Sequence, residues 1–387
     1  MRRIFIAFVL VGAALVALLL TAQTTGASTS PLNLSNTPDD SRNPAIAVAT
    51  NGARHVVWEE TVAISPTLSL TYLQHRFWNG SSWSSSVTVS TGTRAALAVG
   101  PDFNVHLAWT DEFDNAIRVF YSNWNGASWS APQLIVPGLS GDATDPAIVV
   151  DGANTVRVAW GQFDAGAYKI YYATSASGGA GVWSSGPVFN ANGYAPALAL
   201  DGSGGLYMAW HEGLFGAREI YYATLISATW SLSENVSQTA SGDSLMPAIA
   251  LAPGNQPLIA WSEDLSGQLD AHSSIRGAAN WLSLANISNS PTADSSRPRL
   301  GRAQNDLIVA WNESATPAGI KWAFGRAGRW TSPVTLVSGG GSWGGVAVDS
   351  AGDGIVHTVY DGGATANGDV FYTSFNLLHV HLPLIAR

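Results

Sequence analysis

The chain of 387 residues has a net charge of −9, only two lysines (Lys169 and Lys321) and no cysteine. Nucleic-acid binding depends on clustered cationic side chains, so this composition argues against it, and the lack of cysteine excludes disulfides and thiolate chemistry. Charged residues make up 12% of the chain, about half the usual share, whereas Gly (40) and Trp (16) are abundant. This balance is typical of an all-β chain with many short turns.

The first 27 residues are predicted to be a targeting segment. Arg2 and Arg3 precede an apolar run over residues 4–20, and residues 25–27 (TGA) form a small-residue cleavage site. Two alternatives stay open, a cleaved signal peptide or an uncleaved N-terminal anchor, because 17 apolar residues are near the lower limit for spanning a bilayer. Both predict an extracellular or cell-surface protein whose only membrane contact, if the segment is uncleaved, is residues 4–20.

A single sequence pattern is repeated along the rest of the chain. Residues 196–210 read PALALDGSGGLYMAW, which predicts two short strands joined by a turn at residues 201–205. Related segments end on aromatic residues spaced 49 to 51 positions apart: Trp58, Trp109, Trp160, Trp210, Trp261, Trp311 and Tyr360. Each of the first six units also holds an aromatic third strand and a fourth strand that follows a second tryptophan. Seven four-stranded units predict an all-β, seven-bladed β-propeller over residues 28–375, forming one monomeric domain.

The two ends of this array are complementary. The seventh unit lacks a second tryptophan, and residues 32–35 (LNLS) match the fourth-strand segments 234–237 (ENVS) and 285–288 (ANIS). We therefore predict that residues 32–35 pair with the strand around residues 369–374 and close the ring. Residues 376–387 are predicted to form a C-terminal tail or edge strand over the seam; a sorting tag is the alternative, because of the Leu-Pro-Leu sequence.

Two acidic positions recur in the repeats. One lies four residues before the proline of the first strand (Asp40, Asp142, Asn192, Asp243 and Asp294), where Asx side chains usually cap turns. The other follows the second strand, mostly two residues after the marker tryptophan: Glu60, Asp111, Glu212, Glu263, Glu313 and, directly after Tyr360, Asp361. Both positions are expected on one face of a propeller, around the mouth of its channel. The second set is either structural, bonding nearby loops, or a binding ring for a cation, sugar hydroxyls or a basic partner.

The chain resembles the sialidase superfamily of BNR or Asp-box propellers. Residues 41–48 (SRNPAIAV) resemble the opening strand of sialidases, and residues 76–84 (RFWNGSSWS) and 122–130 (SNWNGASWS) resemble Asp-boxes, with Trp78 and Trp124 at the place of the aspartate. The resemblance covers nearly the whole array. It implies a glycoside hydrolase in which Arg42 binds a substrate carboxylate and a tyrosine, best placed at Tyr360, is the nucleophile. Two further arginines are then required, and no later arginine lies in a matching motif; Arg297 looks like a repeat of Arg42 in unit six.

These observations predict an exported binding module for a glycan or protein ligand, with no catalysis assumed. The predicted binding residues are Arg42, Arg297 and the acidic ring (Glu60, Asp111, Glu212, Glu263, Glu313 and Asp361). Calcium is the cofactor that this ring would take, and no other is required. The alternatives are a sialidase-like exo-glycoside hydrolase using Arg42 and Tyr360, and a structural envelope protein. Three arginines converging near a Tyr–Glu pair would favour the enzyme, whereas carboxylates with exposed aromatic residues would favour binding.

Overall fold

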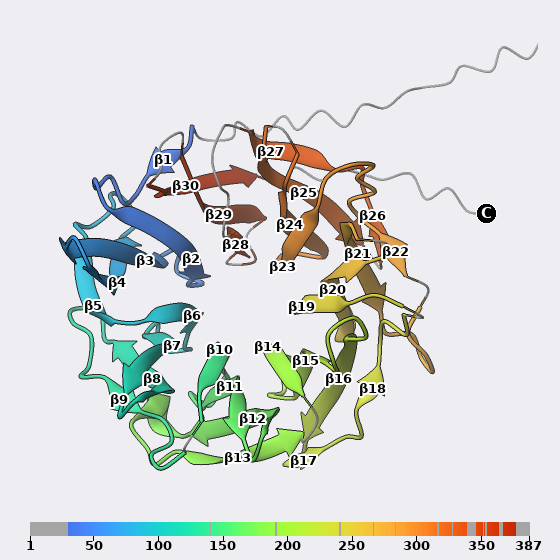
Figure 1. The fold of residues 1–387 in the computed structure, drawn as a ribbon, viewed down its shortest axis with the longest axis horizontal. Helices are drawn as coiled ribbons and strands as arrows, with labels where there is room; N and C mark the ends of the chain where they lie inside the picture. The colour runs from blue at the N-terminus through green and yellow to red at the C-terminus, as the bar shows by residue number, and fades with distance from the viewer. Residues whose placement is uncertain are drawn as a thin grey trace, which may run out of the picture.

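The computed structural model describes residues 30–376, except 140, 190–191, 240, 266, 283, 316, 327, 339–345, 351, 353 and 364–366. These residues form seven small antiparallel sheets arranged in a ring, with one strand of each sheet innermost at the axis (Figure 1). The predicted seven-bladed β-propeller is confirmed. The predicted targeting segment, residues 1–27, and the tail from residue 377 onward lie outside the described residues.

The first four blades follow one another along the chain, each running from the axis outward. Blade 1 contains β2 (Asp40–Val48), β3 (Arg54–Ser65), β4 (Leu68–Trp78) and β5 (Val87–Thr91). Blade 2 contains β6 (Thr93–Val99), β7 (Val105–Phe113), β8 (Ala116–Trp124) and β9 (Gln133–Leu134). Blade 3 contains β10 (Ala143–Val150), β11 (Val156–Asp164), β12 (Ala167–Ser175), the 3₁₀ turn η1 (Ser177–Gly179) and β13 (Ser184–Phe189). Blade 4 contains β14 (Gly193–Leu200), β15 (Leu206–Glu212), β16 (Glu219–Ile226), β17 (Thr229–Trp230) and β18 (Glu234–Asn235).

The last three blades include the seam where the ring closes. Blade 5 contains β19 (Ser244–Ala252), β20 (Gln256–Asp264), β21 (Leu269–Ile275) and β22 (Ala285–Asn286). Blade 6 contains β23 (Ser295–Ala303), β24 (Asp306–Glu313), β25 (Gly319–Arg326), β26 (Arg329–Trp330) and β27 (Val334–Ser338). Blade 7 contains β28 (Val346–Asp349), β29 (Ile355–Gly362), β30 (Asp369–Asn376) and, from the other end of the chain, β1 (Leu32–Asn33). Within the described part of the chain, no helix has the length and apolarity needed to cross a membrane.

The N-terminal strand closes the ring as the sequence predicted. Leu32 pairs with Tyr372 and Asn33 pairs with Phe371 in antiparallel register. Leu34 is fully buried, and its backbone N–H donates to the carbonyl of Val370 at 2.7 Å. This contact joins the two ends of the chain, and β1 covers the outer edge of β30 at Phe371 and Tyr372.

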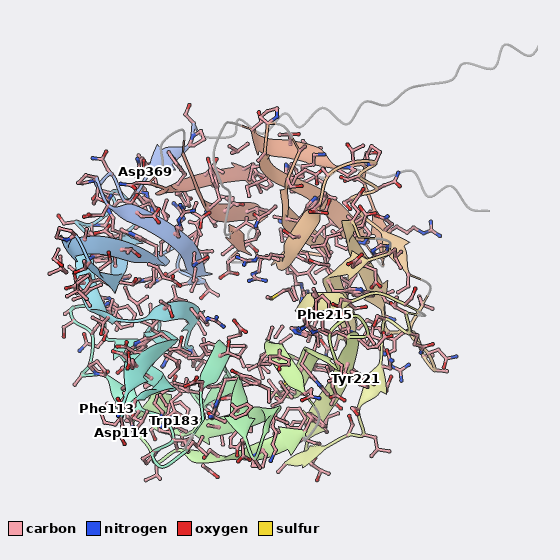
Figure 2. All side chains as sticks on the ribbon, viewed as in Figure 1. Phe113, Asp114, Trp183, Phe215, Tyr221 and Asp369 are labelled. Carbon is pink, nitrogen blue, oxygen red and sulfur yellow. The ribbon has the colours of Figure 1, made fainter. Side chains whose placement is uncertain are left out.

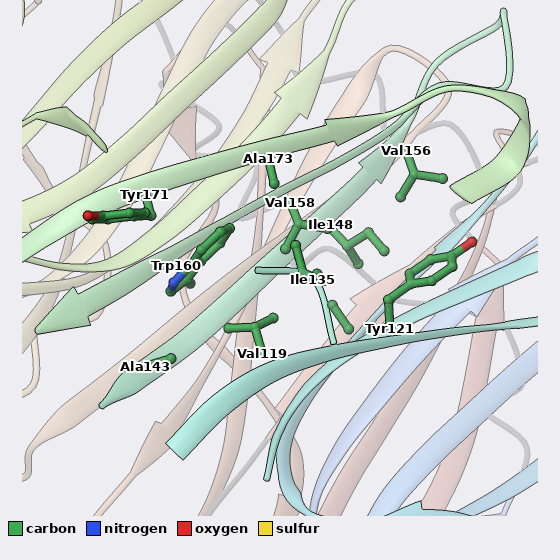
Figure 3. Close-up of a cluster of buried hydrophobic side chains, with 11 residues drawn as sticks. Val119, Tyr121, Ile135, Ala143, Ile148, Val156, Val158, Trp160, Tyr171 and Ala173 are labelled. Carbon is green, nitrogen blue, oxygen red and sulfur yellow. The ribbon is translucent and has the colours of Figure 1, made fainter. Parts of the chain in front are cut away.

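The marker aromatic residues fill the spaces between neighbouring blades. All seven are at most 1% exposed: Trp58, Trp109, Trp160, Trp210, Trp261, Trp311 and Tyr360. In the cluster between blades 2 and 3, Trp160 packs with Val119 of β8 and Ile148 of β10 (Figure 3). Aromatic side chains bury large areas, which makes them suited to hold adjoining sheets together. The fifty-residue repeat is therefore a repeat of blade-to-blade packing.

A bulge at the start of the innermost strand recurs in blades 1 to 6. The pairing register shifts there in each blade, for example between Arg42 and Ala45 in blade 1. One residue in each bulge has φ between 46° and 57°: Asn43, Arg94, Asp145, Ala195, Met246 and Arg297. Proline follows it in every case but Arg94, and proline cannot donate to the ladder, so it fits a bulge. Because bulges redirect side chains, these six positions are turned toward one end of the ring axis, and all six line the cavity there.

Candidate functional site

The acidic residues that follow the marker tryptophans are mostly bonded inside their own blades. Glu60, Glu263 and Glu313 are 7%, 1% and 4% exposed. The carboxylate accepts a hydrogen bond from the indole Nε1–H of its own marker in four blades: Trp58 to Glu60 (3.3 Å), Trp210 to Glu212 (2.9 Å), Trp311 to Glu313 (3.0 Å), and Trp261 to Glu263. Gln162 accepts the equivalent bond from Trp160 at 3.0 Å. The repeated Trp-x-acid motif is thus an internal hydrogen bond of the second strand.

Hydroxyl groups of the incoming loop and inner strand complete these contacts. Glu313 accepts from the hydroxyls of Ser290 and Ser295 at 2.5 and 2.7 Å, and from Lys321 Nζ at 2.9 Å. Burial alone would raise the pKa of Glu313, but these hydrogen bonds together lower it. Glu212 has the indole bond of Trp210, and its pKa is raised by burial. In blades 1, 5 and 6 the acid therefore ties the inner strand and its preceding loop to the second strand.

Asp111 and Asp361 depart from this pattern. Asp111 is one methylene shorter than Glu and accepts from Thr91 Oγ1 at 2.6 Å, while the indole nitrogen of Trp109 has no hydrogen-bond partner in the described chain. Asp361 is fully buried and accepts from the backbone N–H of Asn43, across the seam between blades 7 and 1, at 2.7 Å. No group of three or more His, Asp or Glu side chains in the described part of the molecule is arranged to hold a metal ion. Calcium at the acidic ring stays a prediction.

The residues that the sialidase resemblance implies for catalysis lie outside the cavity lining. Arg42 forms an ion pair with Asp40, with 2.7 Å between Nε and Oδ2. Tyr360 is 1% exposed and packs in the core between blades 6 and 7, where burial raises the pKa of its hydroxyl. Arg297 is not the counterpart of Arg42. In the register of the first two strands, Arg42 lies opposite Glu59 in blade 1, and the equivalent position in blade 6 is Ser296, opposite Asn312. Arg297 instead shares its bulge position with Asn43.

The Asp-box-like segments form matching turns between the third and fourth strands. Asn79 Oδ1 accepts from the backbone N–H groups of Ser81 and Ser82 at 2.9 and 3.0 Å. Asn125 Oδ1 makes the same two bonds, to Ala127 and Ser128, at 3.0 Å each. An asparagine side chain that accepts from amides two and three residues ahead is an ordinary turn-former. In both segments the turn is built by this asparagine, one residue after Trp78 and Trp124.

The inner strands enclose a cavity of about 540 Å³ at the ring axis. Its entrance is formed by the six bulge residues, and Glu59 and Arg299 add charge beside them. Its walls are aliphatic, with Ile46, Leu97, Ile148, Leu198, Ile249 and Leu300 among them. Of the residues predicted to bind a ligand, Arg297 lies in this lining; Asn43, Glu59, Arg94, Asp145 and Arg299 were not predicted. The sequence did contain one signal for the bulge positions. The residue before the proline differs from unit to unit, although the residues on either side of it are similar.

Charge is unevenly distributed around this entrance. On the side of blades 2 and 3, Arg94 forms an ion pair with Asp145 at 2.9 Å, and the backbone N–H of Arg94 donates to Glu59 Oε1 at 2.7 Å. Burial raises the pKa of Glu59, while Arg94 and Asn43 oppose that change. On the side of blade 6, no carboxylate among the described residues lies within ion-pairing distance of Arg299.

The guanidinium of Arg299 is enclosed by the ring although solvent can reach it. Its Nη1 donates to the carbonyl of Pro298 at 3.3 Å. Burial lowers the pKa of Arg299, and the neighbouring charge of Arg297 lowers it further. A guanidinium has five N–H donors in a planar fork, so Arg299 retains donors for a ligand that enters the cavity.

No protein-family model and no curated protein sequence matches the chain. Solved structures do share its fold. An ulvan lyase of polysaccharide lyase family PL25 aligns with a TM-score of 0.62 and 8% identity, over 90% of this chain and 96% of that one. An α-L-arabinanase from Penicillium chrysogenum, complexed with arabinobiose, aligns with a TM-score of 0.53 and 12% identity, over 90% and 98%. The endosialidase of phage phi92 aligns with a TM-score of 0.52 and 8% identity, over 94% and 70%.

At these identities the similarity concerns the fold alone. The resemblance to sialidase propellers therefore holds at the level of the fold. The three enzymes that share this fold have names that refer to three different glycans. Which chemistry this chain performs has to be argued from its own cavity.

Proposed function

We propose that this protein is an exported module that binds a glycan at the mouth of its central cavity and does not cleave it. One observation carries the proposal. Six equivalent bulge positions carry different chemistry (Asn43, Arg94, Asp145, Ala195, Met246 and Arg297), and all six line one cavity. The fold needs only a bulge there, so the varied set of donors and acceptors suits an asymmetric, polyhydroxylated ligand.

Export is part of this proposal and rests on the sequence. The basic pair Arg2–Arg3, the apolar residues 4–20 and the small residues 25–27 are those of a secretory signal or an N-terminal anchor. Cleavage would release the propeller outside the cell, and retention would hold it at the cell surface.

Two observations support binding over hydrolysis. No tyrosine is among the described residues that line the cavity, and Tyr360 is 1% exposed. Three arginines do line the cavity, but Arg94 is paired with Asp145. A sialidase-like reaction needs a tyrosine and a glutamate beside free arginines, so the hydrolase remains the second candidate.

The test is a glycan array probed with purified residues 28–387 in calcium and in chelator. We expect binding to a limited set of glycans, and we expect Arg299→Ala to weaken it at least tenfold. The matched control is Arg302→Ala, an exposed arginine three residues further along β23 and outside the cavity lining. Equal binding by wild type and Arg299→Ala would place the ligand elsewhere. Turnover of fluorogenic glycosides would favour the hydrolase, and binding lost in chelator would favour a calcium site.

A further inference from the structure

A continuous run of aromatic rings crosses from blade 3 to blade 4 on the face where the cavity opens. Phe163 at the end of β11 contacts Tyr168 at the start of β12, with ring centroids 5.4 Å apart. Tyr168 contacts Tyr194 of β14 at 4.6 Å, and Tyr194 stacks on His211 of β15 at 5.5 Å with an interplanar angle of 13°. We call Tyr168, Tyr194 and His211 the aromatic platform.

The aromatic platform adjoins the cavity. Tyr194 directly precedes Ala195, which lines the entrance. Burial lowers the pKa of His211, and the charge of Asp145, another lining residue, opposes that change. Burial raises the pKa of Tyr168, and the charge of Arg94, also in the lining, opposes that change. Charged groups of the cavity therefore lie close enough to act on the platform, which forms its border on the side of blades 3 and 4.

The two tyrosine rings of the aromatic platform are not sealed into the core. Tyr168 and Tyr194 are partly exposed, and the neighbouring Phe163 is 42% exposed. Phe215, in the loop between β15 and β16, is 86% exposed and lies over the guanidinium of Arg218 at 5.3 Å. Seen along the ring axis, Phe215 lies closer to the axis than Tyr221 of the same blade (Figure 2). Neighbouring exposed aromatic rings beside a cavity mark a candidate surface for a ligand.

His211 is the least expected member of the aromatic platform. It is 5% exposed, and its Nδ1 has no hydrogen-bond partner in the described chain. Burial lowers the pKa of His211 to about 4, so the ring is neutral at pH 7. The equivalent position holds Glu59 in blade 1 and Ser262 in blade 5, and each accepts the backbone N–H of the next bulge residue. The unpaired ring nitrogen of His211 therefore has no structural role of that kind.

We infer that the aromatic platform is a second subsite that stacks an uncharged sugar ring of an oligosaccharide whose end occupies the cavity. This inference rests on the proposed glycan-binding function. The face of a sugar ring carries C–H groups that pack on aromatic rings, while its hydroxyls take hydrogen bonds at the edge. The ligand is therefore an oligosaccharide of at least two residues.

Charge around the aromatic platform argues for a neutral sugar there. Three carboxylates act on its rings: Asp142 on Tyr168, and Asp145 and Asp243 on His211. The two nearby arginines are already paired, Arg94 with Asp145 at 2.9 Å and Arg218 with Asp243 at 3.7 Å. An anionic sugar would be repelled here, in contrast to the blade 6 side of the entrance, where Arg299 has no ion pair with the described residues.

The test is calorimetric titration of the full exported chain with gluco-, manno- and arabino-oligosaccharides of one to six residues. We expect affinity to rise about tenfold between one and three residues in the series that binds. Tyr194→Ala should abolish this rise, and Tyr194→Phe, which keeps the ring, should preserve it. Phe215→Ala should reduce the rise two- to threefold, and it is too exposed to unfold the protein. The control is Phe103→Ala, a 49% exposed residue in the turn between β6 and β7 at the opposite end of blade 2.

The outcomes separate the subsite from the function. A ligand whose affinity depends on Arg299 but not on chain length would overturn the subsite and leave the proposed function standing. Undiminished long-chain affinity in both Tyr194→Ala and Tyr168→Ala would do the same. Failure of the wild type to bind any glycan would overturn both.

Discussion

The marker residues and the bulge residues are two rings of equivalent positions in one molecule, and they behave in opposite ways. The marker ring repeats the same chemistry, a buried aromatic residue whose indole bonds an acid two residues later in four blades. The bulge ring repeats the backbone geometry, with φ between 46° and 57°, but its side chains differ. The first ring packs between blades and the second lines a cavity.

The difference teaches where to look for function in a repeat protein. A requirement of the fold applies equally to every blade, so it appears as repetition. A ligand has no sevenfold symmetry, so its site appears as variation at positions that the fold leaves free. Changes in the marker ring should therefore alter stability, and changes in the bulge ring should alter binding.

The largest effect on stability is expected from removing the closing strand. Deletion of residues 28–36 removes the buried Leu34 and exposes the edge of β30, so we expect a large fall in melting temperature and aggregation. Thermal denaturation followed by circular dichroism measures the first effect, and light scattering measures the second. An unchanged melting temperature would contradict ring closure.

The next effect concerns the marker ring itself. Trp210→Ala should destabilise the protein by ~3–5 kcal/mol, since it removes a fully buried aromatic side chain and leaves the Glu212 carboxylate without its indole donor. Urea denaturation measures this change. Glycan affinity of the folded variant should match wild type. Complete quenching of wild-type tryptophan fluorescence by iodide would contradict the burial of the marker ring.

Buried histidines predict a loss of stability in acid. His75 is fully buried, and because Trp129 Nε1–H donates to its Nδ1, its Nε2–H must donate to His55. Burial lowers the pKa of His75 to about 3, and of His55 and His106 to about 4. These values lie below the unfolded value of about 6.5, so the stabilisation is complete above that pH, falls progressively below it, and is fully lost once pH has fallen through 4 to 3.

Urea denaturation at pH 7.5 and pH 4.5 measures this effect, and each histidine contributes on the order of 3 kcal/mol at most. His106→Gln should flatten the pH dependence without changing glycan affinity, because His106 lies in the second strand of blade 2, away from the cavity lining. His211→Gln should flatten it too, but should also weaken oligosaccharide binding. Equal stability at both pH values would show that the histidines are not held neutral.

The smallest effect on stability is expected in the bulge ring and its neighbour Arg299. Arg299→Ala should change the free energy of unfolding by no more than about 0.5 kcal/mol, because the side chain makes one long hydrogen bond and no ion pair with the described residues. Urea denaturation beside Arg302→Ala checks this value. A loss of 2 kcal/mol or more would mean that Arg299 supports the fold and would erase the contrast between the two rings.

The fold could be predicted from sequence because each blade needs the same packing residue at the same place. Trp58 to Tyr360 gave the number of blades, and the match of residues 32–35 to other fourth strands gave the closure. The cavity lining was harder to predict. Whether a residue before proline points into the channel depends on the positive φ of the bulge, which the sequence does not display.

Repetition also drew attention to the acidic residues. Their recurrence predicted either a binding ring or structural bonds, and the indole and hydroxyl partners of Glu60, Glu263 and Glu313 supply the second. Arg297 was included in the predicted site through an apparent match to Arg42 that is one position out of register. The aromatic platform was not predicted, because it joins residues 168, 194 and 211 from two blades, and its stacking depends on the placement of neighbouring sheets.

The closing strand also sets the order in which the molecule can be assembled. Ser35 bonds Asp369 across 334 positions of sequence, so the first strand of the chain has no partner until the last blade exists. Contacts between such distant residues are slow to form, and until then β30 presents an open edge. The β1 segment of a second copy fits that edge equally well, so ring completion competes with strand exchange between molecules. The yield of closed monomers on refolding should therefore fall as protein concentration rises.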